Sequence, residues 1–359
     1  MQQRCRWGIV GTGKIASIMA RALRDSSTGR LVAVASRSDS RARDFAAEFE
    51  VATHHGSYES LIADPEVEIV YVASRHPDHR ACATAAADAG KHVLCEKPLA
   101  MNARDAAEIV EAARRNGTFL MEAFAYRCHP QTSRLVEILA NGDVGQVRIV
   151  DAAFGYDAGL APENYLLVHD LGGGGILDVG CYATSMAHLI AATASGGEAV
   201  ACSDLAGAAH IGSSGVDHYA AAVIKFPGQV IARVACAIQL NLDSTLRIYG
   251  TKGTVIVPSP WLPGRHGPPP TIVIHRHRSG PAEIDVKASA DLYVLEVDAV
   301  GDLVLKGARS HPLMGWDESL ANMTTLDRWR DAIGLGYPQD DVQPAAGVRA
   351  AGITSPGRA

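Results

Sequence analysis

Apolar runs alternate with helical patterns along the first third of the chain. Residues 6–10 form a short apolar run, residues 31–36 and 69–73 are nearly continuous, and residues 91–95 and 118–122 are shorter again. Runs of this kind are typical of parallel strands that helices cover on both faces. They predict at least five strands.

The segments between these strands have the spacing of helices. An alanine-rich helix at 78–89 ends at Gly90, a residue that favours a left-handed cap. Asn102 is typical of an N-cap, and the helix that it begins, at 103–115, stops at Asn116-Gly117. Repeated alternation of strand and helix predicts a doubly wound α/β sheet, whose ligands bind beyond the carboxyl ends of the strands.

The pattern changes after about residue 124. A helix at 132–140 precedes a strand at 146–154, and a glycine-rich run leads into a helix near 178–191. From residue 216 onwards turns separate the strands, which predicts a large, open and mainly antiparallel sheet. Its predicted strands are 218–226, 229–240, 244–250, 253–257 and 271–277.

One strand of this second sheet shows which face is buried. Val230, Ala232 and Val234 alternate as in a strand with one buried face, so the other face is free to meet helices or a second subunit. Two further helices are predicted at 291–305 and 318–333, before a stretch rich in Pro, Gly and Ala.

Composition narrows the function classes. The chain has 359 residues, 47% of them hydrophobic, which is long enough for two cores. A net charge of −6 without a basic stripe argues against a nucleic-acid partner. No targeting segment and no apolar run of about 18 residues is present, which predicts a protein without membrane contact. Seven scattered cysteines without a C-x-x-C pair predict reduced thiols in the cytoplasm and no metal site.

A glycine-rich loop follows the first strand. In Gly11-x-Gly13-x-x-Ala16 the first glycine allows a tight turn, the second allows close approach of a pyrophosphate, and the small third residue packs helix on strand. The pyrophosphate would bind at the N-terminus of the next helix. A glycine turn occurs in other α/β proteins as well, but its position here favours a dinucleotide.

The end of the second strand bears on the choice of cofactor. An NAD site usually has an acid there, whereas this chain has Ser36-Arg37-Ser38 and its first acid only at Asp39. A hydroxyl and a guanidinium suit a 2′-phosphate, so we favour NADP over NAD. The alternative is that Arg37 stacks over the adenine and both cofactors bind.

Glu96-Lys97-Pro98 ends a predicted strand on the same sheet. This position puts an ammonium group close to the expected reactive end of the cofactor, although a solvated turn is the alternative. His76 and His79 follow the strand that ends at Ala73-Ser74, and we expect this loop to contact the cofactor. The candidate cofactor-binding residues are Gly11, Thr12, Gly13, Lys14, Ile15, Ser36, Arg37, Ser74, His76, His79, Glu96 and Lys97.

A second constellation opens with four glycines. Residues 172–175 would let the backbone pass close to something flat, and Asp178 and Tyr182, four residues apart, would share a helix face. With Lys97 they would form a proton-handling group in which the lysine lowers the pKa of the phenol. The alternative is an acid that stabilises a helix dipole beside a buried tyrosine.

Together these segments resemble the Gfo/Idh/MocA oxidoreductases, named for glucose–fructose oxidoreductase and inositol dehydrogenase. The resemblance covers nearly the whole chain, including the hinge-like run at 121–130 and the motifs at 293–299 and 319–323. It implies a Rossmann domain at 1–123, a substrate-binding α/β domain at 124–335 whose open antiparallel sheet makes homodimer or homotetramer contacts, and a tail at 336–359. It also implies hydride exchange between a sugar carbon and nicotinamide without a metal.

The resemblance implies roles for individual residues. Lys97 is the catalytic lysine, with Pro98 setting its direction, and Asp178 matches the family's aspartate. Tyr182 replaces a histidine of many members, which is similar to the dihydrodiol, xylose and glucose–fructose branch. We expect Tyr182 to exchange the hydroxyl proton, Lys97 to assist it and Asp178 to orient both. The candidate substrate-binding residues are Arg127, Tyr156, Asp157, Tyr165 and His169.

These inferences favour an NAD(P)-dependent enzyme that acts on a ring hydroxyl or keto carbon of a sugar or glycoside. One alternative is a trans-dihydrodiol or D-xylose dehydrogenase with the same proton-transfer residues. An alternative of another class is a regulator that binds dinucleotide without turnover, as family members of the galactose pathway do. Lys97, Asp178 and Tyr182 together argue against this regulator.

Overall fold

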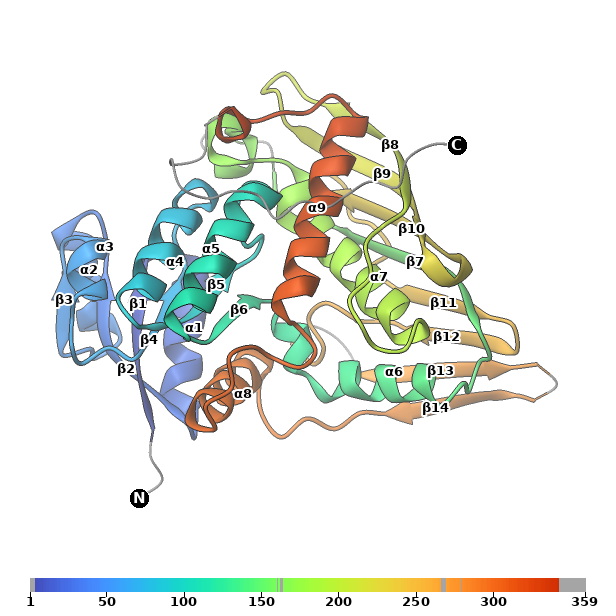
Figure 1. Cartoon of the computed structure of the whole chain (residues 1–359), viewed down its shortest axis with the longest axis horizontal. Coiled ribbons are helices and arrows are strands. Elements are labelled where there is room, and N and C mark those ends of the chain that lie inside the picture. The colour runs from blue at the N-terminus through green and yellow to red at the C-terminus, as the bar shows by residue number, and fades with distance from the viewer. Residues whose placement is uncertain (1–3, 160, 162–163, 266–268, 278, 342–359) are drawn as a thin grey trace.

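The computed structural model of the chain describes residues 4–159, 161, 164–265, 269–277 and 279–341. Within these residues the chain forms two β-sheets with helices packed on them (Figure 1). The first sheet comes from the N-terminal third of the sequence and the second from residues 147–285. This arrangement confirms the predicted fold class.

The first sheet has six parallel strands in the order β3-β2-β1-β4-β5-β6. The order reverses between β1 and β4, so the carboxyl ends of these strands border the crevice where a doubly wound sheet binds its ligand. All five predicted strands are present. β3 was missed because its three residues carry no apolar run. The strands are β1 (Cys5–Val10), β2 (Gly29–Ala35), β3 (Thr53–His55), β4 (Ile69–Val72), β5 (His92–Glu96) and β6 (Leu120–Ala123).

Side chains cap most helices of the first sheet. Ser38, Ser57 and Asn102 each accept a hydrogen bond from a backbone N–H of the helix that follows, and Gly117 ends α5 in the left-handed conformation. The predicted cap at Asn102 is confirmed. The helix after the glycine loop, α1, has no such cap. The helices are α1 (Lys14–Asp25), α2 (Asp39–Glu48), α3 (Tyr58–Ile62), α4 (His79–Asp88) and α5 (Ala103–Asn116).

The second sheet has eight strands in the order β14-β13-β12-β11-β7-β10-β9-β8. Among the described strands of this sheet only β7 and β10 pair in parallel, so the sheet is mainly antiparallel, as predicted. β8 and β14 were not predicted, because neither carries a strong apolar run. The strands are β7 (Val147–Gly155), β8 (Asp204–Ile211), β9 (Asp217–Phe226), β10 (Val230–Ala237), β11 (Leu246–Gly250), β12 (Gly253–Val257), β13 (Thr271–Arg276) and β14 (Pro281–Asp285).

Helices cover one face of the second sheet. α7 (Cys181–Ala194) packs on β7 and β10, while α6 (Pro130–Ala140) contacts β13 (Figure 1). On the opposite face alternate residues are exposed, and some of them are large and apolar: Val223 is 50% exposed and Ile231 is 41% exposed. The predicted alternation of Val230, Ala232 and Val234 is confirmed, since all three are buried.

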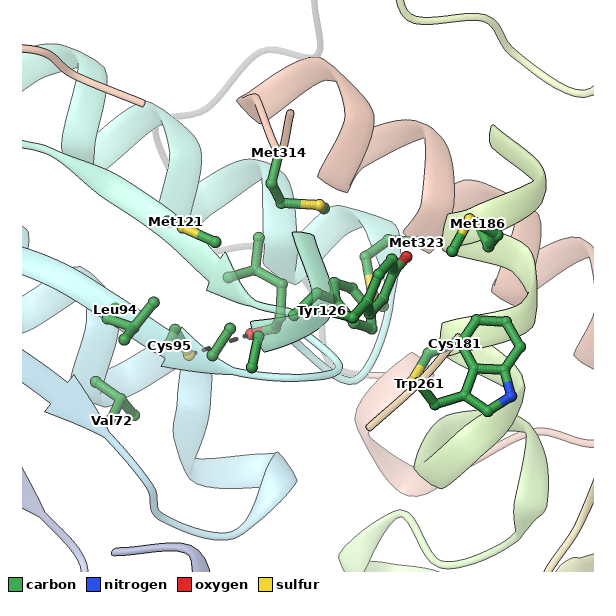
Figure 2. Close-up of a cluster of buried hydrophobic side chains, with 14 of the residues drawn as sticks. Val72, Leu94, Cys95, Met121, Tyr126, Cys181, Met186, Trp261, Met314 and Met323 are labelled. Carbon is green, nitrogen blue, oxygen red and sulfur yellow. Dashed lines mark hydrogen bonds between the residues drawn. The ribbon is translucent and has the colours of Figure 1, made fainter. Parts of the chain in front are cut away.

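A continuous apolar core joins the two sheets. Val72 and Leu94 belong to the first sheet, whereas Cys181 and Met186 lie on α7 in the second half (Figure 2). Tyr126 lies between these groups in Figure 2 and belongs to the same cluster. The two halves of the sequence therefore share one buried interior.

The last two helices return to the first sheet. α8 (Leu292–Leu305) packs on α1, and its Asp298 Oδ1 accepts hydrogen bonds from the backbone N–H groups of Ser27 and Thr28, at 3.0 and 3.1 Å. α9 (Trp316–Ala332) packs on α5 and on α7. Helices from the sequence range assigned to the second domain therefore complete the packing of the first.

The segment assigned to a C-terminal tail begins as packed structure. Residues 336–341 include a short helix, η7 (Pro338–Asp340), and Tyr337 is only 3% exposed. The remainder of the predicted tail, residues 342–359, lies outside the described residues.

One helical stretch, His169–Ala194, is long and apolar enough to cross a membrane by length and composition alone. The sequence was expected to hold no such stretch. In the structure 94% of its most apolar window is buried inside the protein, because α7 is the central helix between the second sheet and α9.

Candidate active site

The predicted catalytic residues meet between the two halves of the molecule. Lys97 follows β5 at the carboxyl edge of the first sheet, and Asp178 lies in a single π-helical turn, η5 (Ile176–Gly180), that leads into α7. The Nζ atom of Lys97 donates hydrogen bonds to the backbone oxygen of Asp178 at 2.6 Å and to its Oδ1 at 3.1 Å. This contact joins residues 81 positions apart in the sequence.

Both members of this pair are charged. Burial, the largest single influence, lowers the pKa of Lys97, but Asp178 and the other acidic groups around it, Glu96 among them, together raise the pKa well above its ordinary value. Burial raises the pKa of Asp178, but the charge of Lys97 and a hydrogen bond from Tyr156 lower it below its ordinary value. At neutral pH the site therefore holds an ammonium group beside a carboxylate.

Tyr156 contributes a contact that the sequence did not predict. Its hydroxyl donates a hydrogen bond to Asp178 Oδ2 at 2.6 Å, so Asp178 bridges Tyr156 and Lys97. Burial and then the charge of Asp178 raise the pKa of Tyr156, which keeps the phenol protonated. Tyr156 was a candidate only for substrate binding, and no sequence signal connects it with Asp178.

Tyr182 faces Lys97 with its ring. The Lys97 Nζ atom lies 5.1 Å from the ring centroid, and the rings of Phe124, Phe154 and Trp261 surround it. Burial raises the pKa of Tyr182 well above its ordinary value, while the charge of Lys97 lowers it. The contribution of Lys97 has the expected sign, but the net shift is opposite to the expected one.

The glycines before Asp178 pack against the protein itself. A Cβ atom on Gly173 would lie 2.4 Å from the backbone oxygen of Leu166, and one on Gly174 would lie 2.2 Å from Asp217 Oδ1. Gly174 also has a φ angle of 105°. The expectation of a flat ligand at these glycines is corrected: they fit the chain between its own loop and β9.

The glycine loop after β1 fits a dinucleotide. Gly11 has a φ angle of 107°, and a Cβ atom there would lie 2.4 Å from the backbone oxygen of Ala73. A Cβ atom on Gly13 would meet no atom within 4 Å, so open space lies at the start of α1. α1 also has no acid in its first turn and no side-chain cap. Its free N–H groups suit an anion such as a pyrophosphate.

Around this loop the other candidates differ in accessibility. Lys14 is exposed, Thr12 and Ile15 are half-buried, and Ser36 is buried and accepts a hydrogen bond from the N–H of Ser38. Arg37 is exposed, and its guanidinium lies 3.2 Å from Asp78 Oδ2 across the edge of the sheet.

His76 and His79 lie between the two loops of the site. The Nδ1 atom of His76 donates to the backbone oxygen of Gly172 at 3.1 Å, and burial lowers the His76 pKa to about 3. His79 is fully buried, and its Nδ1 lies 2.9 Å from the backbone oxygen of Pro98. These contacts make His79 a support for the loop that carries Lys97 and His76 a support for the glycine run before Asp178, and His79 has no exposed atom for a cofactor.

Glu96 and Ser74 also face the protein. The Glu96 carboxylate accepts hydrogen bonds from the Tyr71 hydroxyl and from the N–H of Lys97. Ser74 is half-buried, and its backbone oxygen lies 3.3 Å from His79 Nε2. Of the Glu-Lys-Pro run, the lysine alone points its charged group toward Asp178. The Lys97–Pro98 peptide bond is cis.

Arg127 does not line a pocket. Its side chain is fully buried and donates hydrogen bonds to the backbone oxygens of Leu313 and Ser185, at 2.6 and 2.7 Å. The prediction of a substrate contact is corrected, because this guanidinium ties the region after β6 to α7 and to the segment just before α9. Sequence alone gave no burial signal, since an arginine is rarely buried unless paired.

The other substrate candidates lie on the loop after β7. Asp157 is exposed and its Oδ1 accepts a hydrogen bond from Gly159 N–H at 3.0 Å, while Tyr165 is 52% exposed. Burial and then the charge of Asp178 raise the pKa of Tyr165 to about 12. His169 instead donates through Nε2 to the backbone oxygen of Gly336 at 2.8 Å.

Comparisons with known proteins agree with the observed fold. Residues 5–124 match a model described as an oxidoreductase family with an NAD-binding Rossmann fold, and residues 132–256 match the GFO/IDH/MocA C-terminal domain. The trans-1,2-dihydrobenzene-1,2-diol dehydrogenase of Mus musculus is 34% identical over 345 residues, covering 93% of this chain and 98% of that protein. The human enzyme of the same name is 33% identical over 343 residues, with the same coverage.

Solved structures share the fold. An aldose-aldose oxidoreductase from Caulobacter crescentus, complexed with glycerol, aligns with a TM-score of 0.81 at 23% identity and covers 92% of this chain and 97% of its own. A 3-ketoreductase from Actinomadura kijaniata, in complex with NADP and TDP-benzene, aligns with a TM-score of 0.79 at 25% identity, covering 92% and 98%.

Proposed function

Because the chain belongs to the GFO/IDH/MocA family of NAD-binding oxidoreductases, we propose that it moves a hydride between a nicotinamide cofactor and a ring hydroxyl or keto carbon of a sugar or glycoside. One observation carries this proposal. Lys97 and Asp178 form a buried ion pair at the carboxyl edge of a sheet whose first loop suits a pyrophosphate.

Residues of the first sheet would hold the cofactor. The N–H groups at the start of α1 would bind the pyrophosphate, and Ser36 and Arg37 the adenosine end. Bound nicotinamide supplies or accepts the hydride. Lys97 is placed to orient the substrate oxygen, because an ammonium has three N–H groups and two of them contact Asp178.

In this proposal Tyr182 exchanges the proton of the substrate hydroxyl. Its raised pKa keeps the phenol protonated at neutral pH, so it can act as an acid during reduction. Asp178 and Tyr156 act through Lys97: their hydrogen bonds fix the ammonium group in place. Among the described residues no group of three His, Cys, Asp or Glu side chains is arranged to hold a metal ion.

We favour NADP as the cofactor. Ser36 and Arg37 at the end of β2 suit a 2′-phosphate, and the 3-ketoreductase neighbour is bound to NADP. The double variant Ser36→Asp with Arg37→Ala should shift the ratio of kcat/KM values from NADP toward NAD by at least about tenfold, since a charge-assisted phosphate contact is lost and an acid can bind the ribose. An unchanged ratio would remove this preference.

The rival functions are two other dehydrogenase activities and one regulatory role. The similarity to trans-dihydrobenzenediol dehydrogenases favours a trans-dihydrodiol as the substrate, and a D-xylose dehydrogenase would use the same residues. A regulator that senses dinucleotide without turnover is the alternative of another class.

Part of the proposal is a cytoplasmic location, which the seven unpaired cysteines support because six of them are buried free thiols.

A panel assay tests these functions together. Absorbance of the reduced nicotinamide is followed with NAD or NADP and a panel of aldoses, inositols, glycosides and dihydrodiols. Turnover of one class identifies the substrate. Lys97→Ala should lose at least about 100-fold in kcat while still binding cofactor. Cofactor binding without turnover of any class would favour the regulator, and turnover by Lys97→Ala at the parent rate would exclude the proposed centre.

A further inference from the structure

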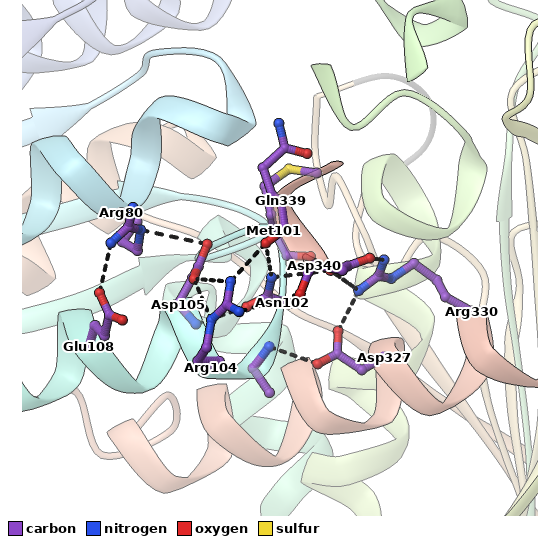
Figure 3. Close-up of polar contacts among 11 residues, drawn as sticks. Arg80, Met101, Asn102, Arg104, Asp105, Glu108, Asp327, Arg330, Gln339 and Asp340 are labelled. Carbon is purple, nitrogen blue, oxygen red and sulfur yellow. Dashed lines mark hydrogen bonds and ion pairs between the residues drawn. The ribbon is translucent and has the colours of Figure 1, made fainter. Parts of the chain in front are cut away.

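The last described segment of the chain contacts both loops that lead to the candidate active site. Residues 336–341, called the C-terminal strap below, follow α9 and contain η7. Figure 3 shows Gln339 and Asp340 of this strap beside Met101, Asn102 and Arg104. The Met101–Arg104 stretch comes directly after the loop that carries Lys97.

On one side the strap binds the glycine run that leads to Asp178. The hydroxyl of Tyr337 donates a hydrogen bond to the backbone oxygen of Gly173, and Gln339 Nε2 donates to that of Asp170 at 3.0 Å. His169 Nε2 donates to the backbone oxygen of Gly336. Three hydrogen bonds therefore fix the chain shortly before η5.

On the other side the strap binds the segment that follows Lys97. Asp340 Oδ1 accepts a hydrogen bond from Asn102 Nδ2 at 3.1 Å, and the backbone oxygen of Gln339 accepts one from Arg104 Nη2 at 2.7 Å (Figure 3). Asn102 is also the cap of α5, so the strap is attached to the start of a helix rather than to a free loop.

A buried arginine links both sets of contacts. Arg330, on α9, is 3% exposed and donates to Asp340 Oδ2 at 2.7 Å and to the backbone oxygen of Met101 at 3.3 Å. Its guanidinium also lies 5.2 Å from the ring centroid of Tyr337. The guanidinium also pairs with Asp327 Oδ1 at 2.6 Å, and a buried charge held by two carboxylates and a backbone oxygen favours one geometry.

We propose that the C-terminal strap sets the separation of Lys97 and Asp178, with Tyr337 as a positioning residue that acts on Asp178 through Gly173. The inference rests on the proposed function, since it assigns the strap a part in that site. Neither Tyr337 nor Asp340 touches the reacting groups. Instead, Tyr337 and Asp340 hold the two loops that carry Lys97 and Asp178. Proton transfer depends on a constant distance between these two loops.

The test variant is Tyr337→Phe, which removes one hydroxyl and keeps the ring between His169 and Arg330. The matched control is Thr325→Val. Thr325 lies on α9, as Arg330 does, and the variant removes another buried hydroxyl, which contacts His188 Nε2 at 2.8 Å. For Tyr337→Phe we expect kcat to fall by about three- to tenfold while KM for the cofactor stays within about twofold. The control should keep kcat at the parent value.

Hydrogen exchange tests the inference without turnover. In Tyr337→Phe the peptides covering 97–102 and 172–180 should both exchange faster than in the parent, whereas in Thr325→Val neither should change. Faster exchange at 172–180 alone, or an equal fall of kcat in both variants, would overturn the strap's role. A parent protein without turnover on every substrate would instead sink the proposed function, and the exchange data would still decide on the strap.

Discussion

Asp178 accepts hydrogen bonds from Lys97 and from Tyr156, one on each carboxylate oxygen. Lys97 occupies Oδ1 and Tyr156 occupies Oδ2, so the carboxylate has few lone pairs left for a substrate. Tyr182 has a different environment, because aromatic rings surround it and it meets Lys97 with its face. The two tyrosines are therefore expected to differ in function.

Phenylalanine substitutions separate these two roles. Tyr182→Phe should lower kcat by at least about 100-fold, because the group that exchanges the substrate proton is lost. Tyr156→Phe should lower kcat by only about tenfold, because Lys97 keeps its own contacts with Asp178. Steady-state kinetics measures both variants, and a fluorescence titration of the reduced cofactor checks that binding is unchanged. A larger loss in Tyr156→Phe than in Tyr182→Phe would reverse the assignment.

Glu122, at the end of β6, links stability to pH. Its Oε1 accepts a hydrogen bond from the N–H of Leu99 at 2.9 Å, and burial raises its pKa from 4.5 to about 7. Because the pKa is higher in the folded chain, the folded state binds more protons between these values, and stability falls as the pH rises from 4.5 to 7. The full effect is on the order of 3 kcal/mol.

The variant Glu122→Gln should remove most of this dependence. Glutamine stays neutral and its carbonyl can still accept the bond from Leu99, so the variant should be more stable than the parent above pH 7 and similar to it near pH 5. Melting temperatures of both proteins at pH 5 and pH 8 measure the difference. An identical change with pH in the two proteins would show that Glu122 is ionised in the folded state.

Individual site residues could be predicted from the sequence by their position after strands and in motifs. Lys97, Asp178 and Tyr182 come together as this reasoning expected, because Lys97 follows β5 at the carboxyl edge of the first sheet and the turn that leads into α7 packs against that edge. It did not identify the bond of Tyr156 or the burial of Arg127, since both depend on how distant segments pack. Its pKa argument for Tyr182 omitted burial, which outweighs the charge of Lys97.

Among the helices of the first sheet, α1 and α4 begin without a side-chain cap, but α4 continues directly from a short helix, η1 (His76–Asp78), whereas α1 does not. α2, α3 and α5 satisfy their first N–H groups with Ser38, Ser57 and Asn102, whereas α1 begins at a glycine loop with open space in front of it. A helix end left without a cap is costly unless solvent or a ligand supplies the acceptor. This contrast makes α1 the element most suited to an anion.

Substitution of the two loop glycines separates binding from folding. Gly13→Ala should keep the melting temperature, because the φ angle is −88° and its Cβ would meet no atom within 4 Å, but should weaken cofactor binding by at least about tenfold by filling the space at the helix end. Gly11→Ala should lower the melting temperature, because its Cβ would lie 2.4 Å from a backbone oxygen. Fluorescence titration and thermal melting measure both. Normal cofactor affinity in Gly13→Ala would place the pyrophosphate elsewhere.

The elements that the sequence predicted are those with their own apolar pattern. β1, β2, β4, β5 and β6 have continuous apolar runs, and β9 and β10 alternate. β8 is rich in alanine and glycine, and β14 is an exposed edge strand, so neither has a local signal. The return of α8 to the first sheet was also unpredicted, because it depends on contacts between Asp298 and residues 26–28 rather than on a pattern in the helix.

In the whole molecule the two sheets have different surroundings. Helices flank the first, whereas the second is covered on one face only (Figure 1). On its open face Ile149 lies opposite Ile231, and Val223 lies opposite Arg233, whose guanidinium pairs with Asp151. Apolar side chains grouped around an ion pair are typical of a protein interface rather than of a surface that remains in water.

We therefore predict that this face forms a homodimer or homotetramer contact, and one charge should break it. Val223→Asp would place a carboxylate among apolar side chains, at a site that is 50% exposed in the single chain and that we expect the contact to bury. Light scattering coupled to size exclusion should show the parent as an oligomer and Val223→Asp as a monomer. Leu305→Asp, the same kind of change at a 39% exposed residue of α8, should leave the oligomer intact.

A monomeric parent, or an equal loss in both variants, would leave the open face unexplained by self-association. If the oligomer breaks only in Val223→Asp, kcat should stay close to the parent value, because every contact of Lys97, Asp178 and Tyr156 described above lies within one chain.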